Sequence, residues 1–216
     1  MVIANIAHAQ GVFDYVTFDG IDYLRWIDEP GRAPAREDLG PEFAIVECAM
    51  VGDRQGCPYG MDAGAAYLPA GTPMYAVKGY RTDFRLVAVA GGRLLLYQAW
   101  RNSRAKTGGQ LFDIAQRVHS VEVQRGERTP ATAATPVRVS DKRDADALVD
   151  MILGATVRAP RPHPSAERRY WITLWLADGT TLGRPYFADT SELLGGVALP
   201  PEFGRIVERY LNHLTD

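Results

Sequence analysis

Two cysteines, Cys48 and Cys57, are the side chains best suited to covalent chemistry in this chain. A hydrolytic set of Cys57, His119 and Asp62 is conceivable, because a cysteine nucleophile is recognised by its spatial neighbours and not by sequence order. Cys57, however, precedes a proline in a loop, whereas reactive thiols often lie at a helix N-terminus that lowers their pKa. We therefore disfavour this set.

The same cysteines leave two structural alternatives. In an exported protein they would form a disulfide that closes a loop of about ten residues, worth on the order of 2–3 kcal/mol through chain entropy. In the other alternative Cys48 is a buried thiol on a strand and Cys57 is a thiol in a loop. Two cysteines without a nearby histidine pair do not make a structural zinc site.

Acidic residues near the N-terminus raise the question of calcium, because hard cations bind clustered oxygens. Asp14, Asp19, Asp22 and Asp28 lack the alternating ligands, central glycine and distal glutamate of a calcium loop, so we interpret them as solvated hairpin edges. No two histidines share a spacing suited to one metal; they are His8, His119, His163 and His213. The sequence predicts no metal and no cofactor.

Common catalytic motifs are missing from the sequence. It contains no HExxH, CxxC or GxSxG, so zincin, thioredoxin-like and α/β-hydrolase chemistry lack their signatures. Lys106-Thr107-Gly108-Gly109 resembles a phosphate-binding loop only superficially, since the glycines of such a loop precede the lysine.

Arginine and tryptophan residues are the remaining candidates for a binding surface. Trp171, Thr173 and Trp175 share one face of a predicted strand, which is either covered by the N-terminal sheet or open for stacking on a sugar or peptide; we favour the covered face. Arginines in exposed loops, one of them following Trp100, could converge on an anionic polymer, although solvated loops explain them more simply. The candidate ligand-binding residues are Trp100, Arg101, Arg104, Arg161, Arg168, Arg169, Trp171 and Trp175.

β-hairpins must position most of these residues. The stretch from Ala65 to Trp100 contains two apolar runs joined by Gly91-Gly92, and a type I′ turn requires a positive φ at both central residues. Asp19-Gly20 predicts a first hairpin in the same way. Runs that are apolar on both faces are covered on both sides, so we expect this part to form an antiparallel sheet or a small barrel.

The pattern of the chain changes after its midpoint. Helical spacing of apolar residues between Ala145 and Ile152 follows a capping Ser140 or Asp141. Asp178-Gly179 predicts a hairpin over residues 170–187. Prolines then precede an amphipathic helix that begins near Pro201, which we expect to lie on that hairpin.

These patterns indicate an α+β fold. Residues 1–125 form a β-rich part, residues 126–136 form a linker rich in Thr, Ala and Pro, and residues 137–216 form a unit of strand, helix, hairpin and helix. The two parts could also pack as one globule.

The charge balance excludes some classes of partner. Lys and Arg number 24 against 26 Asp and Glu, and neither half of the chain carries the basic excess that suits a nucleic-acid backbone. No apolar run is long enough for a transmembrane helix. The first residues, MVIANIAHAQ, are either the remnant of an export signal or an N-terminal strand, and we favour the strand.

Two pieces of the chain resemble uncharacterised, mostly extracytoplasmic or lipoprotein-like proteins of bacteria. The first is LPAGTPMYAVKGY followed by FRLVAVAGGRLLLYQA, and the second is YWITLWLADGTTLGRPYF followed by LPPEF. The resemblance implies a location at the cell envelope, with the cytoplasm as the alternative, and no known reaction.

We therefore predict a non-catalytic module that binds a ligand or a protein at the cell envelope, with an anionic polymer or a protein as its partner. The alternative is a hydrolase whose site is assembled from residues that the sequence does not connect. A deep polar pocket with converging titratable groups would favour the hydrolase, and a shallow groove or an exposed apolar patch would favour the module.

Overall fold

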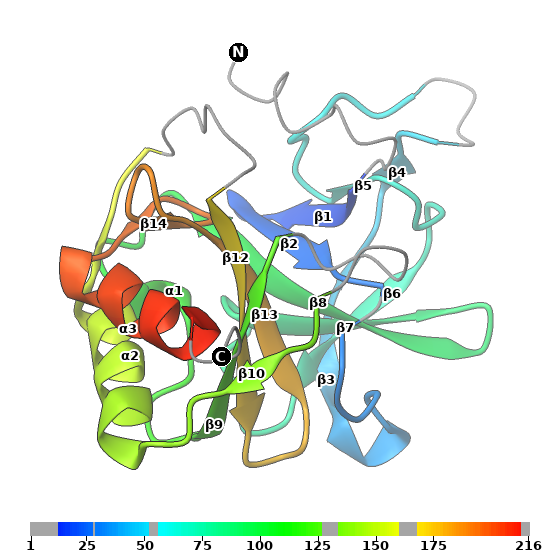
Figure 1. Ribbon diagram of the computed structural model, residues 1–216. Coiled ribbons are helices and arrows are strands. Elements are labelled where there is room, and N and C mark those ends of the chain that lie inside the picture. Colours follow the sequence, from blue (N-terminus) through cyan, green and yellow to red (C-terminus); the bar gives the residue numbers. More distant parts are fainter. Residues whose placement is uncertain (1–12, 28, 52–55, 127–133, 160–167, 213–216) are drawn as a thin grey trace. The chain divides into compact units, whose positions relative to one another are not determined.

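The computed structural model describes residues 13–27, 29–51, 56–126, 134–159 and 168–212 (Figure 1). The chain forms two compact units: unit 1 comprises Met1–Ile27 and Ala33–Arg104, and unit 2 comprises Asp28–Arg32 and Ala105–Asp216. Each unit is built on its own β-sheet, so the expected α+β class with antiparallel sheets is confirmed. Most of the expected linker at residues 126–136 lies outside the described residues.

Unit 1 contains an eight-stranded sheet with the order β3-β6-β7-β8-β2-β1-β5-β4. Its neighbouring strands pair in antiparallel fashion, except that β4 and β5 are parallel. The strands are β1 (Asp14–Phe18), β2 (Ile21–Arg25), β3 (Leu39–Ile45), β4 (Cys48–Ala49), β5 (Gly64–Ala65), β6 (Pro73–Val77), β7 (Arg85–Ala90) and β8 (Arg93–Asn102). A 3₁₀ helix, η2 (Arg36–Asp38), precedes β3.

Both hairpins expected in unit 1 are present. Gly91 and Gly92 have φ values of 55° and 74° between β7 and β8. Asp19 and Gly20 have φ values of 51° and 69° between β1 and β2. These values match a type I′ turn, whose twist suits the right-handed twist of the flanking strands.

The sheet of unit 1 is curled. Phe18 on β1 and Phe43 on β3 lie with their ring centroids 5.9 Å apart, although four strands separate β1 from β3 in the sheet. The curl encloses a core in which Val16, Met74 and Leu86 are fully buried. Burial of such side chains is the main favourable contribution to the stability of the unit.

Unit 2 contains a seven-stranded antiparallel sheet with the order β10-β9-β12-β13-β14-β15-β11. The strands are β9 (Val118–Arg125), β10 (Val137–Arg138), β11 (Thr156–Val157), β12 (Arg169–Leu176), β13 (Thr181–Phe187), β14 (Glu192–Leu193) and β15 (Val197–Ala198). The helices are α1 (Gly108–Leu111), α2 (Lys142–Gly154) and α3 (Pro201–Asn212). The predicted C-terminal unit did not contain β9, which pairs along the whole of β12.

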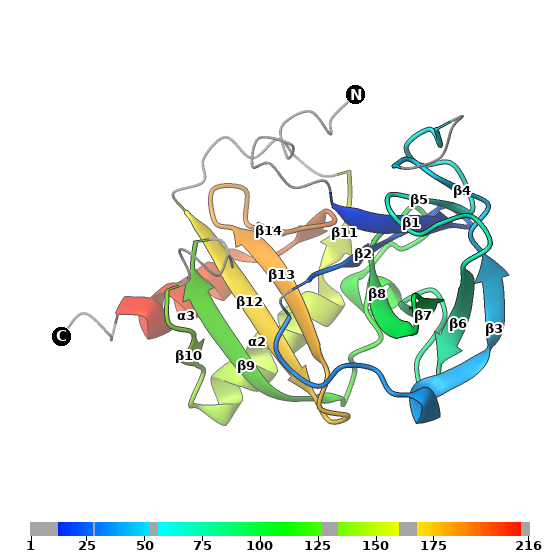
Figure 2. The same ribbon diagram turned by 90° about the vertical axis from the view of Figure 1, so that its right-hand side faces the viewer.

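Helices α2 and α3 lie beside each other against one face of this sheet (Figures 1 and 2). Phe203 of α3 packs on Tyr186 of β13 with ring centroids 4.9 Å apart. Gly204 lets the helix approach closely, because a Cβ at this position would lie 2.8 Å from the Tyr186 hydroxyl oxygen. No helix within the described ranges is long and apolar enough to cross a membrane.

A short piece of the N-terminal half belongs to unit 2. The Thr181 hydroxyl donates to the Pro30 carbonyl oxygen at 2.6 Å, and the Gly183 N–H donates to the Glu29 carboxylate at 2.5 Å. The Arg32 N–H donates to the Gly179 carbonyl oxygen at 2.9 Å. Residues 29–32 are therefore fastened along β13 and its turn.

The loop expected after Trp100 is partly regular structure. Strand β8 continues through Asn102, and α1 begins after Thr107. Thr107 and Gln110 form a capping box in which each side chain accepts from the other's backbone N–H. The Gly108 N–H donates to the Ala155 carbonyl oxygen at 2.8 Å, which places α1 against the end of α2.

We expect Gly108→Ala to destabilise unit 2 by at least about 3 kcal/mol, because overpacking next to backbone atoms forces the chain to shift. A Cβ at residue 108 would lie 1.8 Å from the Ile152 carbonyl oxygen. The matched control is Gly109→Ala, where the nearest atom would lie at 3.4 Å. Thermal unfolding followed by circular dichroism measures both, and equal melting temperatures for the two variants would contradict this packing.

Candidate functional site

Cys48 and Cys57 form a disulfide in unit 1, which is the bridged one of the two alternatives. Cys48 lies on β4 and pairs with Gly64 on β5, and the chain between Pro58 and Gly64 turns back on itself. The Met61 N–H donates to the Pro58 carbonyl oxygen at 3.2 Å, and the Gly64 N–H donates to the Met61 carbonyl oxygen at 3.0 Å. The bridge thus anchors this turn to the edge of the sheet.

Three exposed apolar side chains surround the bridge, and we call Met50, Tyr59 and Met61 the disulfide face. Their exposed fractions are 37%, 38% and 43%. Tyr15 of β1 lies beneath them: its hydroxyl donates to Met50 Sδ at 2.6 Å, and its ring centroid lies 4.9 Å from that of Tyr59. An anchored tyrosine and two methionines are typical of a contact surface, since these residues are enriched at protein interfaces.

An ion pair between the buried Asp22 and the half-exposed Arg101 borders the disulfide face. Asp22 is only 2% exposed, and its carboxylate accepts from the Thr17 hydroxyl at 2.8 Å. Arg101 approaches the other carboxylate oxygen at 2.7 Å. The charges of Asp22 and Arg101 both act on the Tyr59 hydroxyl, whose pKa is raised mainly by burial and further by Asp22. The disulfide face is therefore bordered by polar side chains, Asp22 and Arg101, whose charges cancel.

The tip of the hairpin between β1 and β2 contacts both the disulfide-linked turn and the residues that follow β8. The Asp19 N–H donates to the Asp62 carboxylate at 2.5 Å, and Arg104 approaches the Asp19 carboxylate at 2.8 Å. Arg104 holds the pKa of Asp19 below its usual value through a hydrogen bond and through its charge. Asp62 and Asp19 thus tie the disulfide-linked turn to the end of β8.

The hydrolytic set of Cys57, His119 and Asp62 is not formed. Cys57 is bonded to Cys48 and carries no thiol, and a nucleophilic cysteine acts as its thiolate. Asp62 accepts from the Asp19 N–H, and His119 lies on β9 of unit 2. Nothing in this arrangement resembles a nucleophile with its base.

Calcium is disfavoured by the partners of the acidic residues. Asp14 accepts from Arg25 at 2.6 Å and from the Tyr97 hydroxyl at 2.7 Å, while Asp19 and Asp22 each face an arginine. Asp28 lies outside the described residues. No group of three His, Cys, Asp or Glu residues that could hold a metal occurs within the part of the chain that the structure describes.

The remaining predicted site residues of unit 1 take part in packing. Trp100 is 8% exposed, and the Arg101 guanidinium lies 5.6 Å from its ring centroid. Arg101 is half-exposed and Arg104 is exposed. Of the predicted set, Arg101 is the residue that borders the disulfide face.

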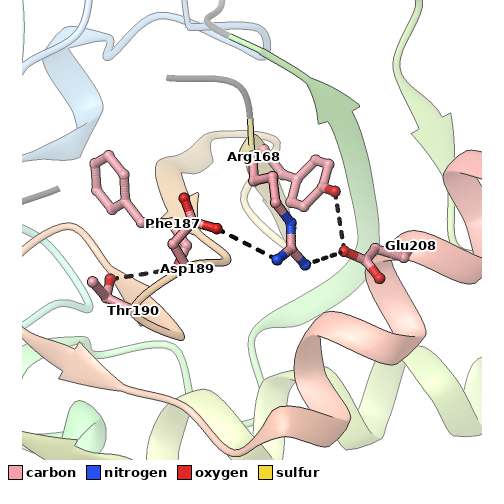
Figure 3. A network of polar contacts seen from close by, with 6 residues as sticks. Arg168, Phe187, Asp189, Thr190 and Glu208 are labelled. Atoms are coloured by element: carbon pink, nitrogen blue, oxygen red, sulfur yellow. Dashed lines mark hydrogen bonds and ion pairs between the residues drawn. The ribbon is translucent and has the colours of Figure 1, made fainter. Parts of the chain in front are cut away.

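Arg168 in unit 2 lies between two carboxylates (Figure 3). Its guanidinium approaches Asp189 at 3.4 Å and Glu208 of α3 at 3.0 Å, and the Tyr170 hydroxyl donates to the same Glu208 oxygen at 3.2 Å. Glu208 raises the pKa of Arg168. This network links the start of β12 to α3 and leaves no surplus positive charge.

The strand face that carries Trp171, Thr173 and Trp175 is covered over most of its length, and a covered face was the favoured of the two alternatives. Trp171 and Thr173 are each 6% exposed, and Trp175 is partly buried. A Cβ at Gly183 would lie 2.8 Å from Trp171 Nε1 and 2.8 Å from a Glu29 carboxylate oxygen, so the backbone segment around Glu29 lies close to this ring. Arg169 places its guanidinium 5.4 Å from the Phe187 ring centroid. Arg161 lies outside the described residues.

Two hollows in unit 2 lack catalytic groups. The first is an apolar cavity of about 10 Å³ beside Phe112, Ile152 and Arg184, which has room for about one water molecule. The second is an open groove of about 470 Å³ between the end of α2 and the start of α3. Its lining contains no titratable side chain; the residues are Met151, Gly154, Ala155, Thr156, Ala198, Leu199 and Pro200.

Comparisons with known proteins return no relative. No family model matches the chain, and searches of the curated proteins and of the solved structures find no match either. The interpretation of the site therefore rests on its residues and their geometry.

Part of this site was predictable from the sequence. The spacing of Cys48 and Cys57 allowed a disulfide, and Arg101 was among the candidates. The roles of Tyr15, Met50 and Met61 were missed, because a tyrosine on a strand and scattered methionines carry no motif. A pattern of exposed Met and Tyr on both sides of a cysteine pair is the signal that could have found them.

We expect the oxidised protein, unfolded without reductant, to show no titratable thiol. Replacing both cysteines, as in Cys48→Ser with Cys57→Ser, should lower the free energy of unfolding by on the order of 2–3 kcal/mol, the entropy of a loop this short. Ellman titration and denaturant unfolding measure the two quantities. Two reactive thiols in the untreated protein would exclude the bridge.

Tyr15 should make stability fall in alkaline solution. Burial raises the pKa of Tyr15 from 10.0 to about 12, with further contributions from Tyr59 and Asp22. Between these values the unfolded chain loses this proton while the folded protein keeps it, so the contribution is complete below pH 10 and is lost toward about pH 12. The free energy of unfolding, measured with denaturant across this pH window, should therefore fall less steeply with pH for Tyr15→Phe than for the wild type. Parallel pH profiles for the two proteins would contradict the shift.

Proposed function

We propose that this protein is a non-catalytic binding module whose disulfide face contacts a protein partner. The observation that carries the proposal is the group of exposed apolar side chains formed by Tyr59 and Met61 on an anchored turn and by Met50 after β4. Solvent-exposed apolar side chains gathered in one place are a common mark of an interaction surface. Tyrosine and methionine contribute large contact areas, and tyrosine does so with few rotatable bonds.

A rigid support strengthens the proposal. The disulfide and the ring contact between Tyr15 and Tyr59 restrict the turn before any partner arrives, and the Tyr15 hydrogen bond holds Met50 beside β1. Preorganisation lowers the entropy cost of binding, so such a face can bind with less loss of side-chain freedom. The Arg101–Asp22 pair at its border supplies polar groups of both signs without a net charge.

An anionic polymer fits this protein less well as a partner. The half-exposed or exposed arginines Arg101, Arg104 and Arg168 each face a carboxylate within 4 Å, at distances of 2.7, 2.8 and 3.0 Å. Polyanion binding depends on positive charge that is free to replace counterions. Local neutralisation removes that contribution, and the net charge of −2 adds none.

The hydrolase alternative finds little support among the described residues. The cysteine that could act as nucleophile is oxidised, and the two hollows of unit 2 hold no converging acid and base. Enzyme sites generally combine a pocket with titratable groups of shifted pKa. The raised pKa values of this protein belong mainly to tyrosines that burial keeps protonated.

We also propose a location at the cell envelope. The Cys48–Cys57 bridge supports it, because disulfides persist in oxidising compartments and are rare where glutathione keeps thiols reduced. Alkylation of intact cells before lysis tests this proposal. Recovery of both cysteines in the alkylated form would place the protein in a reducing compartment.

A random peptide display library panned against the oxidised protein tests the binding proposal. We expect enriched peptides with apolar anchors whose affinity falls at least about tenfold in Tyr59→Ser, as for a central interface residue. Ile45→Ser is the matched control, because Ile45 is 50% exposed on β3 and lies outside the disulfide face. The control should leave binding unchanged.

Three outcomes would overturn this function. The first is an equal loss of peptide binding in Tyr59→Ser and Ile45→Ser. The second is salt-dependent binding of polyphosphate that Arg101→Ala and Arg104→Ala abolish, which would favour the anionic polymer. The third is turnover of chromogenic esters, phosphates or glycosides by the purified protein, which would favour the hydrolase.

A further inference from the structure

Sulfur atoms gather at one point of unit 1. Cys48 Sγ is bonded to Cys57 Sγ and lies 3.7 Å from Met61 Sδ. The three residues come from β4 and from the turn before β5, so the fold and not the sequence order brings them together. A disulfide alone does not require a thioether at this distance.

Gly64 lies directly beside these sulfur-containing side chains. A Cβ at this position would lie 2.7 Å from Cys57 Sγ and 3.4 Å from Met61 Cβ, and Cys48 is its partner in the parallel ladder. The absent side chain therefore leaves room in which the Cys57 and Met61 side chains stand close together.

The cluster is open to solvent on one side. Met61 is 43% exposed and Cys48 is partly buried, while Cys57 is only 5% exposed. A metal ion could enter from the side of Met61 and Cys48, with the Cys57 sulfur beneath. The buried neighbour would restrict hydration of the ion once it is bound.

We propose that the reduced form of this cluster binds one Cu(I) ion through Cys48, Cys57 and Met61. Thiolate and thioether sulfurs are soft ligands that select Cu(I) over harder ions. With metal–thiolate bonds of about 2.3 Å, as for zinc, two sulfurs on one trigonal ion lie about 4 Å apart. In the disulfide-bonded protein Met61 Sδ lies 3.7 Å from Cys48 Sγ, so the thioether is already beside a sulfur that reduction frees for the metal.

The ligand set distinguishes Cu(I) from zinc. Structural zinc sites use four cysteine, histidine or carboxylate ligands. The part of the chain that the structure describes offers no third residue of those types beside the two cysteines. Asp62, the neighbour of Met61, already accepts from the Asp19 N–H. The methionine thioether is therefore the group that completes the set.

Reduction of the Cys48–Cys57 bond must precede copper binding. A dithiol, either a small molecule or the dithiol site of a reductase, transfers two electrons and two protons to the Cys48–Cys57 bond and becomes a disulfide. Cu(I) then displaces the two thiol protons and forms two copper–thiolate bonds, while Met61 binds as a neutral ligand. The copper stays monovalent throughout. A disulfide oxidant that accepts two electrons from the thiolates re-forms the Cys48–Cys57 bond, becomes a dithiol and releases the Cu(I).

This site does not depend on the proposed protein partner, because copper binding requires the reduced cysteines and peptide binding uses the oxidised protein. The test is an anaerobic titration of dithiol-reduced protein with Cu(I) held by the chromophoric chelator bicinchoninate. We expect the reduced protein to withdraw one Cu(I) per chain and to gain the ultraviolet absorption of a copper–thiolate bond. X-ray absorption at the copper edge should count three sulfur neighbours.

Matched variants separate this site from adventitious binding by two thiols. Met61→Leu should weaken Cu(I) binding by about tenfold or more, as loss of a group that supports a metal site typically does. Met50→Leu is the control, because it removes an exposed methionine whose sulfur contacts the Tyr15 hydroxyl, and its affinity should stay within about twofold of the wild type. Circular dichroism of the reduced proteins reports whether each remains folded.

Four results would overturn the site. Equal affinity in Met61→Leu and the wild type would reduce it to two cysteines, and an equal loss in Met50→Leu would remove the special role of Met61. Binding of Zn(II) in preference to Cu(I) would contradict the soft ligand set. A reduced protein that unfolds and does not regain its spectrum with Cu(I) would show that the fold does not hold the ligands together.

Discussion

The need to neutralise charge inside two β-sheets constrains most of this structure. Asp14, Asp22 and Glu192 are nearly or fully buried, and each has a basic partner within 4 Å. Arg85 is fully buried and lies 4.5 Å from the Tyr80 ring centroid. Removing one member of such a pair leaves a buried charge whose desolvation is costly, so these partners are hard to change singly. The same pairing commits these ionisable groups to structural contacts.

Sulfur and aromatic side chains around one covalent bond form an exposed surface in unit 1. The Cys48–Cys57 bridge restrains a turn that carries Tyr59 and Met61, and Tyr15 supports it from the sheet. The proposed contact with a protein and the proposed coordination of a soft ion both use this region, but in different oxidation states. The same few residues could therefore take part in two separate events, with the redox state of the bridge deciding between them.

Local patterns predicted much of the fold. Gly91-Gly92 and Asp19-Gly20 place their residues in left-handed backbone conformations as expected, because few residue pairs tolerate a type I′ turn. The pattern that begins near Pro201 also marked its helix, since an apolar stripe is a local property. The attachment of Glu29 and Pro30 to β13 was not foreseeable, because it joins residues about 150 positions apart through hydrogen bonds that leave no periodic signal. The sulfur cluster was hidden for the same reason. Helix α1 was not predicted. Thr107 and Gln110 have the spacing of a capping box, but the two glycines between them are typical of a loop.

The fastening of residues 29–32 along β13 makes unit 2 discontinuous in sequence. A ribosome delivers this short piece long before the hairpin that receives it, so unit 2 cannot complete its native contacts until the hairpin has been synthesised. A fragment that starts at Ala105 would likewise lack the carboxylate that accepts from the Gly183 N–H and the carbonyl that accepts from the Thr181 hydroxyl. Gene dissection at the apparent boundary would thus yield a unit without these contacts to β13, and a synthetic peptide spanning this piece could restore them by fragment complementation.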